Sequence, residues 1–305
     1  MSTVRPAQRG LLFLGCLLAF VRWEPAPYDL FLIIIFLLYA RGLTWKSYQL
    51  VFVVLLGPLL FTHVPALGAA LEVAPERTLY YSLVTLYLAL SSVFFMSLPE
   101  RSVPLLLLGY EVGALLSGLL GVLAFLRIPG LEDLLWGGSR AVAFFKDPNV
   151  FGAFLIPALF LALARLEQGR KFWILPALIL FLGVLVSLSR GAWANFAVAL
   201  LAWWLLRPRK RIWLPLVLLT LAGGVGISVV VMPDNPIVQR LGFMPYDKER
   251  FFTQMEALSL ALTQPLGYGP GLSEIHLSYA THNTYVRFLA EVGWLGLFFW
   301  LLILG

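Results

Sequence analysis

Long apolar runs separated by short polar segments dominate the chain. A helix of about 20 apolar residues crosses about 30 Å of hydrocarbon, and the runs do not alternate apolar and polar residues as the strands of a membrane barrel do. The pattern therefore predicts an all-α fold, a polytopic transmembrane helical bundle of about ten spans. The first two runs are short, so a re-entrant pair is the alternative for them. The runs cover roughly residues 10–21, 29–40, 49–64, 79–98, 103–126, 149–164, 172–189, 191–206, 212–232 and 286–305.

The composition agrees with a membrane protein. Hydrophobic residues make up 60% of the 305 residues and charged residues 12%, with a mean hydropathy of +0.88, whereas an ordinary soluble domain is about 25% charged. Too little polar surface remains to coat a soluble globule. The single cysteine, Cys16, lies in the first apolar run, so we expect it to pack as a small hydrophobe. We expect no cleavable signal peptide, because this run lacks a small-residue cleavage site and more spans follow it.

Lysine and arginine are denser in one alternating set of connections than in the other. Because cytoplasmic loops are enriched in these residues, the denser set and the N-terminus are predicted to be cytoplasmic. The segment RPRKR at 207–211 is the strongest marker. Such anchors account for most of the net charge of +6, so we expect no nucleic-acid partner. The denser set comprises Arg5, Arg9, Arg41, Lys46, Arg101, Arg165, Arg170, Lys171, Arg207, Arg209, Lys210 and Arg211.

One long connection, residues 233–285, falls on the opposite side, which the same rule makes periplasmic or extracytoplasmic. Phe252, Met255, Leu258 and Leu262 recur at helical spacing within it. We therefore expect short helices in this loop, one of them lying along the outer membrane face. The segment GYGPG at 267–271 predicts a turn that follows this helix.

Four polar clusters stand out against the apolar background, and the predicted topology places all of them on the non-cytoplasmic face. Because they are far apart in sequence, this common placement suggests a shared site. The clusters are FFKDPNVFGAF at 144–154, SLSRGAW at 187–193, YDKERFF at 246–252 and THN at 281–283.

Two arginines in these clusters are candidates for binding an anion. Arg190 sits between two spans, where a cation normally faces a cavity or a partner unless it reaches out to the interface. Arg250 lies in the long loop beside Lys248, and an ordinary solvated charge is the alternative there. Guanidinium groups suit phosphate because they offer paired donors to its oxygens.

The remaining candidates adjoin predicted helix starts. His282 can act as a general base near neutral pH, or be a structural histidine at a helix cap. Asn283 is expected to cap the last helix, and DPN at 147–149 predicts a helix start with a capping Asp or Asn. Lys146 adds a further cation. No metal site is expected, because three scattered histidines, one cysteine and no spaced carboxylate pair make no ligand shell.

The order of these motifs resembles the O-antigen ligase and O-antigen polymerase superfamily of bacterial inner-membrane proteins, which also includes protein O-oligosaccharyltransferases. The resemblance runs from about residue 140 to the end. Members usually continue with further spans, so a fragment and a short variant are both open. The motifs are DPN before a span, SRGAW at a helix pair, an arginine and PLGYGPG in a long outer loop, and HNTYVRFLAEVGWLG.

The resemblance implies a metal-independent, cofactor-free glycosyltransferase with its active site on the periplasmic face. The donor would be a glycan on undecaprenyl diphosphate, and the acceptor a hydroxyl of a glycan, of lipid A-core or of a protein. Residues 1–139 would form N-terminal transmembrane helices embedded in membrane lipids. Residues 140–305 would form the catalytic region, including the loop 233–285.

The resemblance implies a role for each candidate site residue. Arg190 and Arg250 match the arginines that would hold the diphosphate, and His282 would deprotonate or orient the acceptor hydroxyl. Asn283 would support His282, and Asn149 matches the asparagine of the PN motif. These two asparagines, with the neighbouring cations Lys146 and Lys248, are the expected substrate-binding residues. Glu291 is expected to be structural or to orient a polar partner.

A membrane transporter is the rival from another class, because transporters also use broken spans and polar helix ends. A transporter should place its charges near the midplane of the bilayer and show two similar halves. Here the predicted charges lie at one face and no internal repeat is evident. A structural scaffold is the third option, which the loop arginines and histidine argue against.

Overall fold

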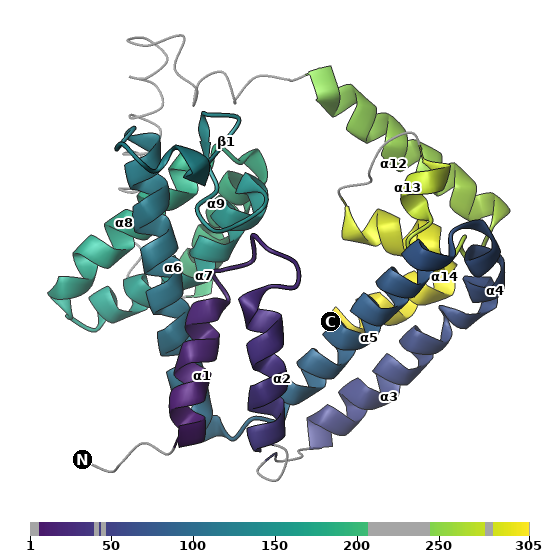
Figure 1. Ribbon diagram of the computed structural model, residues 1–305, viewed down its shortest axis with the longest axis horizontal. Helices are drawn as coiled ribbons and strands as arrows, with labels where there is room; N and C mark the ends of the chain where they lie inside the picture. Colours follow the sequence, from purple (N-terminus) through teal and green to yellow (C-terminus); the bar gives the residue numbers. More distant parts are fainter. Residues whose placement is uncertain (1–5, 40–42, 44–46, 207–244, 278–282, 305) are drawn as a thin grey trace. The chain divides into compact units, whose positions relative to one another are not determined.

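The computed structural model describes the chain except residues 1–5, 40–42, 44–46, 207–244, 278–282 and 305. The described part is mostly helical (Figure 1). It forms two compact units, each built from two stretches of sequence. Unit 1 comprises Met1–Arg41 and Glu100–Gly242, and unit 2 comprises Gly42–Pro99 and Phe243–Gly305.

Unit 1 contains six helices, three short 3-10 turns and one small hairpin in its described residues. Contacts run from α1 to α6, from α6 to α8 and from α7 to both α8 and α9. The hairpin strands pair antiparallel, with Trp136 opposite Arg140. The elements are α1 (Pro6–Leu17), α2 (Pro27–Tyr39), η1 (Glu100–Ser102), α6 (Val103–Phe125), η2 (Glu132–Leu134), β1 (Leu135–Trp136), β2 (Arg140–Ala141), α7 (Pro148–Glu167), η3 (Lys171–Trp173), α8 (Ile174–Val186) and α9 (Arg190–Leu206).

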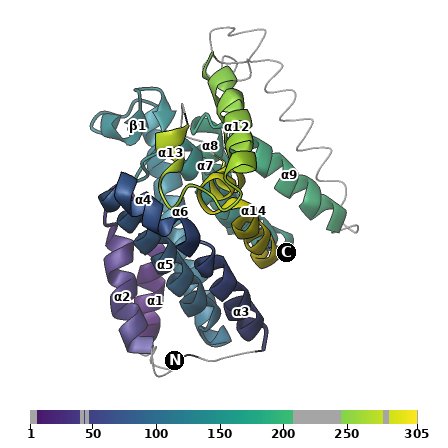
Figure 2. The same cartoon turned by 90° about the vertical axis from the view of Figure 1, so that its right-hand side faces the viewer.

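Unit 2 pairs an N-terminal group of helices with the C-terminal part of the chain. Helix α14 contacts α3, α12 and α13, and Trp294 Nε1 donates to Ala261 O at 3.2 Å between α14 and α12 (Figure 2). The elements are α3 (Ser47–Phe61), α4 (Val64–Val73), α5 (Pro75–Met96), α12 (Pro245–Thr263), α13 (Ser273–His276) and α14 (Thr284–Leu304).

Four helices in the described residues are long and apolar enough to cross a membrane, namely α5, α6 extended from Glu100, α7 and α14. The pair Gln49–Phe61 and Val64–Val73 makes a fifth span if this bent pair, with its 42° angle, counts as one. The chain is therefore a helical membrane protein. The expected number of about ten spans is not confirmed. Helices are present at most other predicted positions, but they are short, as Pro27–Tyr39 and Lys171–Val186 are, and 212–232 lies outside the described residues.

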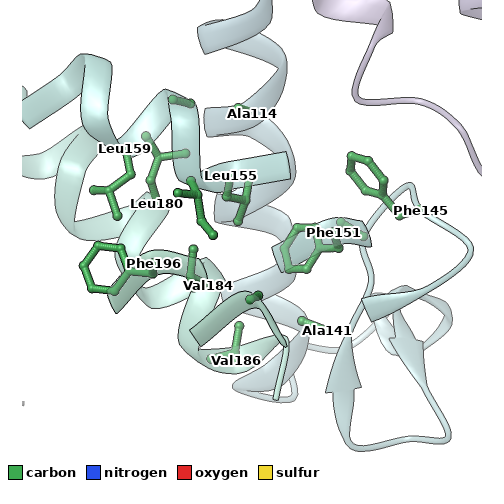
Figure 3. Close-up of a cluster of buried hydrophobic side chains, with 14 of the residues drawn as sticks. Ala114, Ala141, Phe145, Phe151, Leu155, Leu159, Leu180, Val184, Val186 and Phe196 are labelled. Atoms are coloured by element: carbon green, nitrogen blue, oxygen red, sulfur yellow. The ribbon is translucent and has the colours of Figure 1, made fainter. Parts of the chain in front are cut away.

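The core of unit 1 is a cluster of aliphatic and aromatic side chains between α6, α7, α8 and α9 (Figure 3). Phe151 and Leu155 of α7 are fully buried and lie with Leu180 and Val184 of α8. Close packing of this kind fixes where the first turn of α7 sits relative to the end of α8. On α6, a Cβ added at Gly109 would lie 1.9 Å from the Leu12 carbonyl oxygen of α1, so a small residue is required for the approach of these helices.

A tyrosine from α6 repairs a break inside α7. Pro157 cannot donate a backbone hydrogen bond, and its ring disturbs the ladder around it. The hydroxyl of Tyr110 donates to Phe154 O at 2.5 Å and accepts from Ala158 N at 3.2 Å. The side chain therefore replaces a backbone bond within the apolar segment and ties α6 to α7.

The helix predicted around residues 252–262 is present as α12. Its small residues Ala257 and Ala261 are buried, whereas the large apolar side chains that defined the periodicity are exposed. The apolar face of α12 therefore points away from the rest of unit 2. The exposed fractions are 65% for Phe252, 67% for Met255, 40% for Leu258 and 71% for Leu262.

We predict that the ion pair between α6 and α7 stabilises unit 1. Glu111 is buried and its carboxylate lies 2.6 Å from Arg165 Nη2, whose guanidinium stacks 4.0 Å from the Trp173 ring centroid. Glu111→Ala should cost about 3 kcal/mol, because it leaves a charge in an apolar surrounding without its partner. The midpoint of thermal unfolding in detergent would measure the loss. The exposed Glu132→Ala is the control, and an equal midpoint for both variants would contradict the role of the pair.

Candidate functional site

The first turn of α7 is built by the segment DPN. Asp147 is the N-cap, and its Oδ1 accepts a hydrogen bond from Asn149 N at 2.6 Å. Pro148 occupies the first helical position, where a missing N–H costs nothing. The predicted helix start is therefore confirmed. The side chain of Asn149 is left exposed at the helix end, next to the connection from the hairpin.

The start of α9 lies directly beside this turn. Ser189 precedes Arg190 and caps the helix, because its Oγ accepts from Ala192 N at 3.1 Å. The same hydroxyl donates to Asn149 Oδ1 at 2.8 Å. Within unit 1, the clusters 144–154 and 187–193 are thus in contact, as their predicted common face suggested. Arg190 is half-buried at the first position of α9.

Arg140 joins these residues, although it belongs to none of the polar clusters or motifs of the sequence. Its Nη2 donates to Asn149 Oδ1 at 3.2 Å and its Nε donates to the Ser187 carbonyl oxygen at 3.2 Å. The guanidinium therefore connects the end of α8 to the start of α7. The one sequence signal was the pair Gly137 and Gly138, which favours a turn, but a two-residue strand is too short to show a period.

Lys146 is close in sequence to this cluster and is engaged elsewhere. Its Nζ forms an ion pair with Glu24 in the connection between α1 and α2. Its side chain remains 45% exposed, so the pair lies at the surface of unit 1. A surface pair of this type contributes at most about 1 kcal/mol, which leaves the ammonium group able to exchange partners.

In unit 2, two further candidates lie near the start of α12. Lys248 is exposed, Arg250 is half-buried and Asp247 is buried. Residues two apart on a helix point to different sides, which explains the different exposure of Lys248 and Arg250. Negative charge near a helix N-terminus is favourable, so Asp247 suits its position in the first turn.

Asn283 caps α14, as predicted. Its Oδ1 accepts from Tyr285 N at 3.0 Å and from Val286 N at 3.3 Å. These are the backbone donors that an N-cap side chain normally satisfies. His282, the expected general base, lies outside the described residues, so its position stays a prediction.

A buried carboxylate follows on α14. Glu291 Oε1 accepts from Ser273 Oγ at 2.6 Å and from Arg287 Nε at 3.0 Å. Arg287 lies over the ring of Tyr81, 4.4 Å from its centroid, and Arg77 approaches the same ring at 5.3 Å. Glu291 thus holds polar partners in place, which agrees with its expected role.

The GYGPG segment lies against α14 where this helix is interrupted. Helical geometry is interrupted at Gly293, with φ 69° and ψ −169°. Tyr268 N and Gly269 N donate to the carbonyl oxygens of Ala290 and Glu291, both at 2.9 Å. Trp294 N, which follows the break, donates to Pro265 O at 3.1 Å. The predicted turn therefore serves as the hydrogen-bonding partner of an interrupted helix.

No group of three His, Cys, Asp or Glu side chains able to hold a metal ion occurs among the residues that the structure describes. Beside carboxylates such as Asp147 and Asp247, the helix starts carry guanidinium, ammonium, amide and hydroxyl groups. Such donors bind anionic oxygen, because their N–H and O–H groups and the positive helix ends favour negative charge.

The features above define a helical membrane protein with donor-rich helix starts and a broken C-terminal helix. Residues 175–301 match a family described as O-antigen ligase, which confirms the resemblance drawn from the motifs. The match includes Arg190, Arg250, His282 and Asn283, and Asn149 precedes it. No curated protein and no solved structure matches the chain.

We predict that Gly267 is required by its close approach to α14. A Cβ added there would lie 2.4 Å from Glu291 O, and φ is +82°. Gly130 has a similar φ of +85° with open space around it, so Gly130→Ala is the matched control. Both variants bear about 1–2 kcal/mol of left-handed strain, and only Gly267→Ala adds the clash. Its thermal midpoint in detergent should be clearly lower, and equal midpoints would show that the contact is unimportant.

Proposed function

We propose that the chain is a metal-independent glycosyltransferase of the bacterial inner membrane. It moves a glycan from undecaprenyl diphosphate to an acceptor hydroxyl on the periplasmic face. The contact between Asn149 and the SLSRG segment supports this proposal most strongly, because it gathers donors suited to a diphosphate in unit 1. The O-antigen ligase match over residues 175–301 supports the reaction class.

In the proposed step, the acceptor oxygen attacks the anomeric carbon of the donor glycan. The bond from that carbon to the diphosphate oxygen breaks, and undecaprenyl diphosphate leaves with the bonding electron pair. The acceptor proton passes to His282, which acts as general base. Arg190 and Arg250 stabilise the charge that grows on the departing diphosphate. Because diphosphate is a good leaving group, its departure needs cations that stabilise its negative charge rather than an acid that protonates it.

The remaining polar residues have supporting roles in this proposal. Asn283 caps α14 and thereby fixes the backbone that follows His282. Asn149, Lys146 and Lys248 add donors for the anionic part of the substrate. Membrane lipids surround the apolar helices, and the acceptor is a glycan, lipid A-core or a protein. Ligase, polymerase and protein glycosyltransferase share this chemistry and differ only in that acceptor.

A transporter is the second candidate, because the break of α14 at Gly293 and the bent pair α3–α4 are features that transporters use. Transport moves a solute unchanged across the bilayer, whereas transfer creates a new glycosidic bond. Reconstituted vesicles that carry the donor in one leaflet distinguish the two. A glycosylated acceptor supports the enzyme, and translocation of an unaltered solute supports the transporter.

We predict that Arg190→Ala, Arg250→Ala and His282→Ala each lower glycan transfer by at least about 100-fold, the usual contribution of one charged stabiliser or base. Transfer would be measured with purified protein, an undecaprenyl-diphosphate glycan and candidate acceptors, with a chelator present throughout. The exposed Arg127→Ala, placed in no motif, is the matched control. Full transfer by His282→Ala would remove the base from the proposal, and wild-type transfer that is absent in the chelator and restored by added divalent metal would remove metal independence.

We also predict that positions 248 and 282 face the periplasm and that Arg170 faces the cytoplasm. Cys16 is the one cysteine of the chain, so a Cys16→Ala background allows single cysteines to be introduced at each position. An impermeant maleimide added to intact spheroplasts should label Lys248→Cys and His282→Cys but not Arg170→Cys. Labelling of the first two only after lysis would place the candidate residues on the wrong face for this reaction.

A further inference from the structure

We propose that Arg140 is a positioning residue in unit 1. It orients the Asn149 amide so that the N–H groups of this amide face the diphosphate of the glycan donor. This inference rests on the proposed function. It assigns a role to a residue outside the recognised motifs and outside the matched region 175–301.

The orientation of the Asn149 amide follows from the hydrogen-bond donors around its side-chain oxygen. Oδ1 accepts from Arg140 Nη2 at 3.2 Å and from Ser189 Oγ at 2.8 Å. An amide oxygen has two lone pairs, and a guanidinium has donors only. If the amide were reversed, its NH₂ group would meet the donors of Arg140. The oxygen therefore faces inward, and Nδ2 points away from both partners.

Arg140 is itself held by a second bond. Its Nε donates to the Ser187 carbonyl oxygen at 3.2 Å, next to Leu188, which has a positive φ of 48°. The hairpin turn supports this placement, because β2 contacts α6, α7 and α8. A guanidinium joins two acceptors with a fixed angle between its donors, and an ammonium group cannot reproduce this geometry. The side chain therefore sets the distance and orientation between α7 and the α8–α9 connection.

The orientation of the Asn149 amide decides whether its outward side attracts or repels an anion. An amide oxygen directed outward would repel an anionic oxygen, whereas an NH₂ group donates to it. Asn149 is exposed and lies on the first turn of α7, whose positive end adds to this preference. Asn149 is hydrogen-bonded to Ser189, which directly precedes Arg190 in the sequence. The Asn149 amide therefore lies against the start of α9.

The test is the binding of undecaprenyl diphosphate to the purified full-length protein in nanodiscs. Asn149→Asp keeps the size of the side chain and can accept from Arg140 and Ser189, but it presents an oxygen outward. We expect Asn149→Ala to weaken binding about 5–10-fold through loss of one donor. We expect Asn149→Asp to weaken it by a further factor of about 10, through like-charge repulsion. A purely structural role for Asn149 gives the opposite order, with Asp near wild type and Ala impaired.

A double-mutant cycle tests whether Arg140 acts through Asn149. Arg140→Ala alone should weaken binding about as much as Asn149→Ala, and the double variant should bind no more than about 2-fold more weakly than Asn149→Ala. Arg140→Lys should recover only part of the loss, and Arg127→Ala, the exposed control, should bind like the wild type. Additive losses in the double variant would show that Arg140 touches the ligand directly and would overturn the positioning role.

Binding and transfer are read separately on the same preparations. The expected order of binding without any transfer would overturn the proposed function and leave the role of Arg140 intact. Transfer with Asn149→Asp binding as tightly as the wild type would overturn this inference alone. Absence of undecaprenyl diphosphate binding by the wild type would overturn it as well. Thermal midpoints of all variants identify any loss that comes from unfolding.

Discussion

Backbone polar groups in a hydrocarbon layer have no water to bond, and each one left without a partner costs several kcal/mol. The apolar helices α7 and α14 are disturbed at Pro157 and at Gly293, and a specific neighbouring group bonds the backbone at each of these positions. At Pro157 that group is the Tyr110 hydroxyl. At Gly293 it is the backbone of Pro265, Tyr268 and Gly269. This requirement decides which segments far apart in sequence must come together.

The same requirement places the candidate chemistry at helix starts. Asp147, Ser189 and Asn283 each satisfy backbone donors of the helix that follows. Their neighbours in sequence are Asn149, Arg190 and His282. A helix start offers partial positive charge and oriented N–H groups, which favour an anion without any metal. Caps that secure the fold are therefore adjacent in sequence to the residues proposed to bind a diphosphate.

Local signals in the sequence were sufficient for some of these features. Pro, Asp and Asn at the starts of α7 and α14 predicted the caps, because capping depends on residues within one turn. The helical period between 252 and 262 predicted α12. It could not predict that Phe252 and Met255 would be exposed, since the small residues Ala257 and Ala261 pack instead. In an apolar chain, size rather than hydrophobicity decides which face of a helix is buried.

Other features depend on contacts between distant segments and had no local signal. Gly293 lies within a continuous apolar run, so its break becomes visible only when the 265–269 segment is placed against it. Arg140 sits in a two-residue strand, and only its approach to Ser187 and Asn149 identifies it. The predicted number of about ten spans is not confirmed, because several apolar runs form helices shorter than a span and 212–232 lies outside the described residues. His282 remains a prediction from the resemblance.

The central claim is that the donor-rich helix starts bind a lipid-linked diphosphate. Photocrosslinking measures this most directly, with an undecaprenyl diphosphate analogue that carries its reactive group beside the phosphates. The labelled peptides of the purified protein would be identified by mass spectrometry. The account predicts label in peptides that contain Asn149, Arg190 or Arg250. Label confined to peptides around Arg170 and Lys171, at the predicted cytoplasmic side, would contradict it.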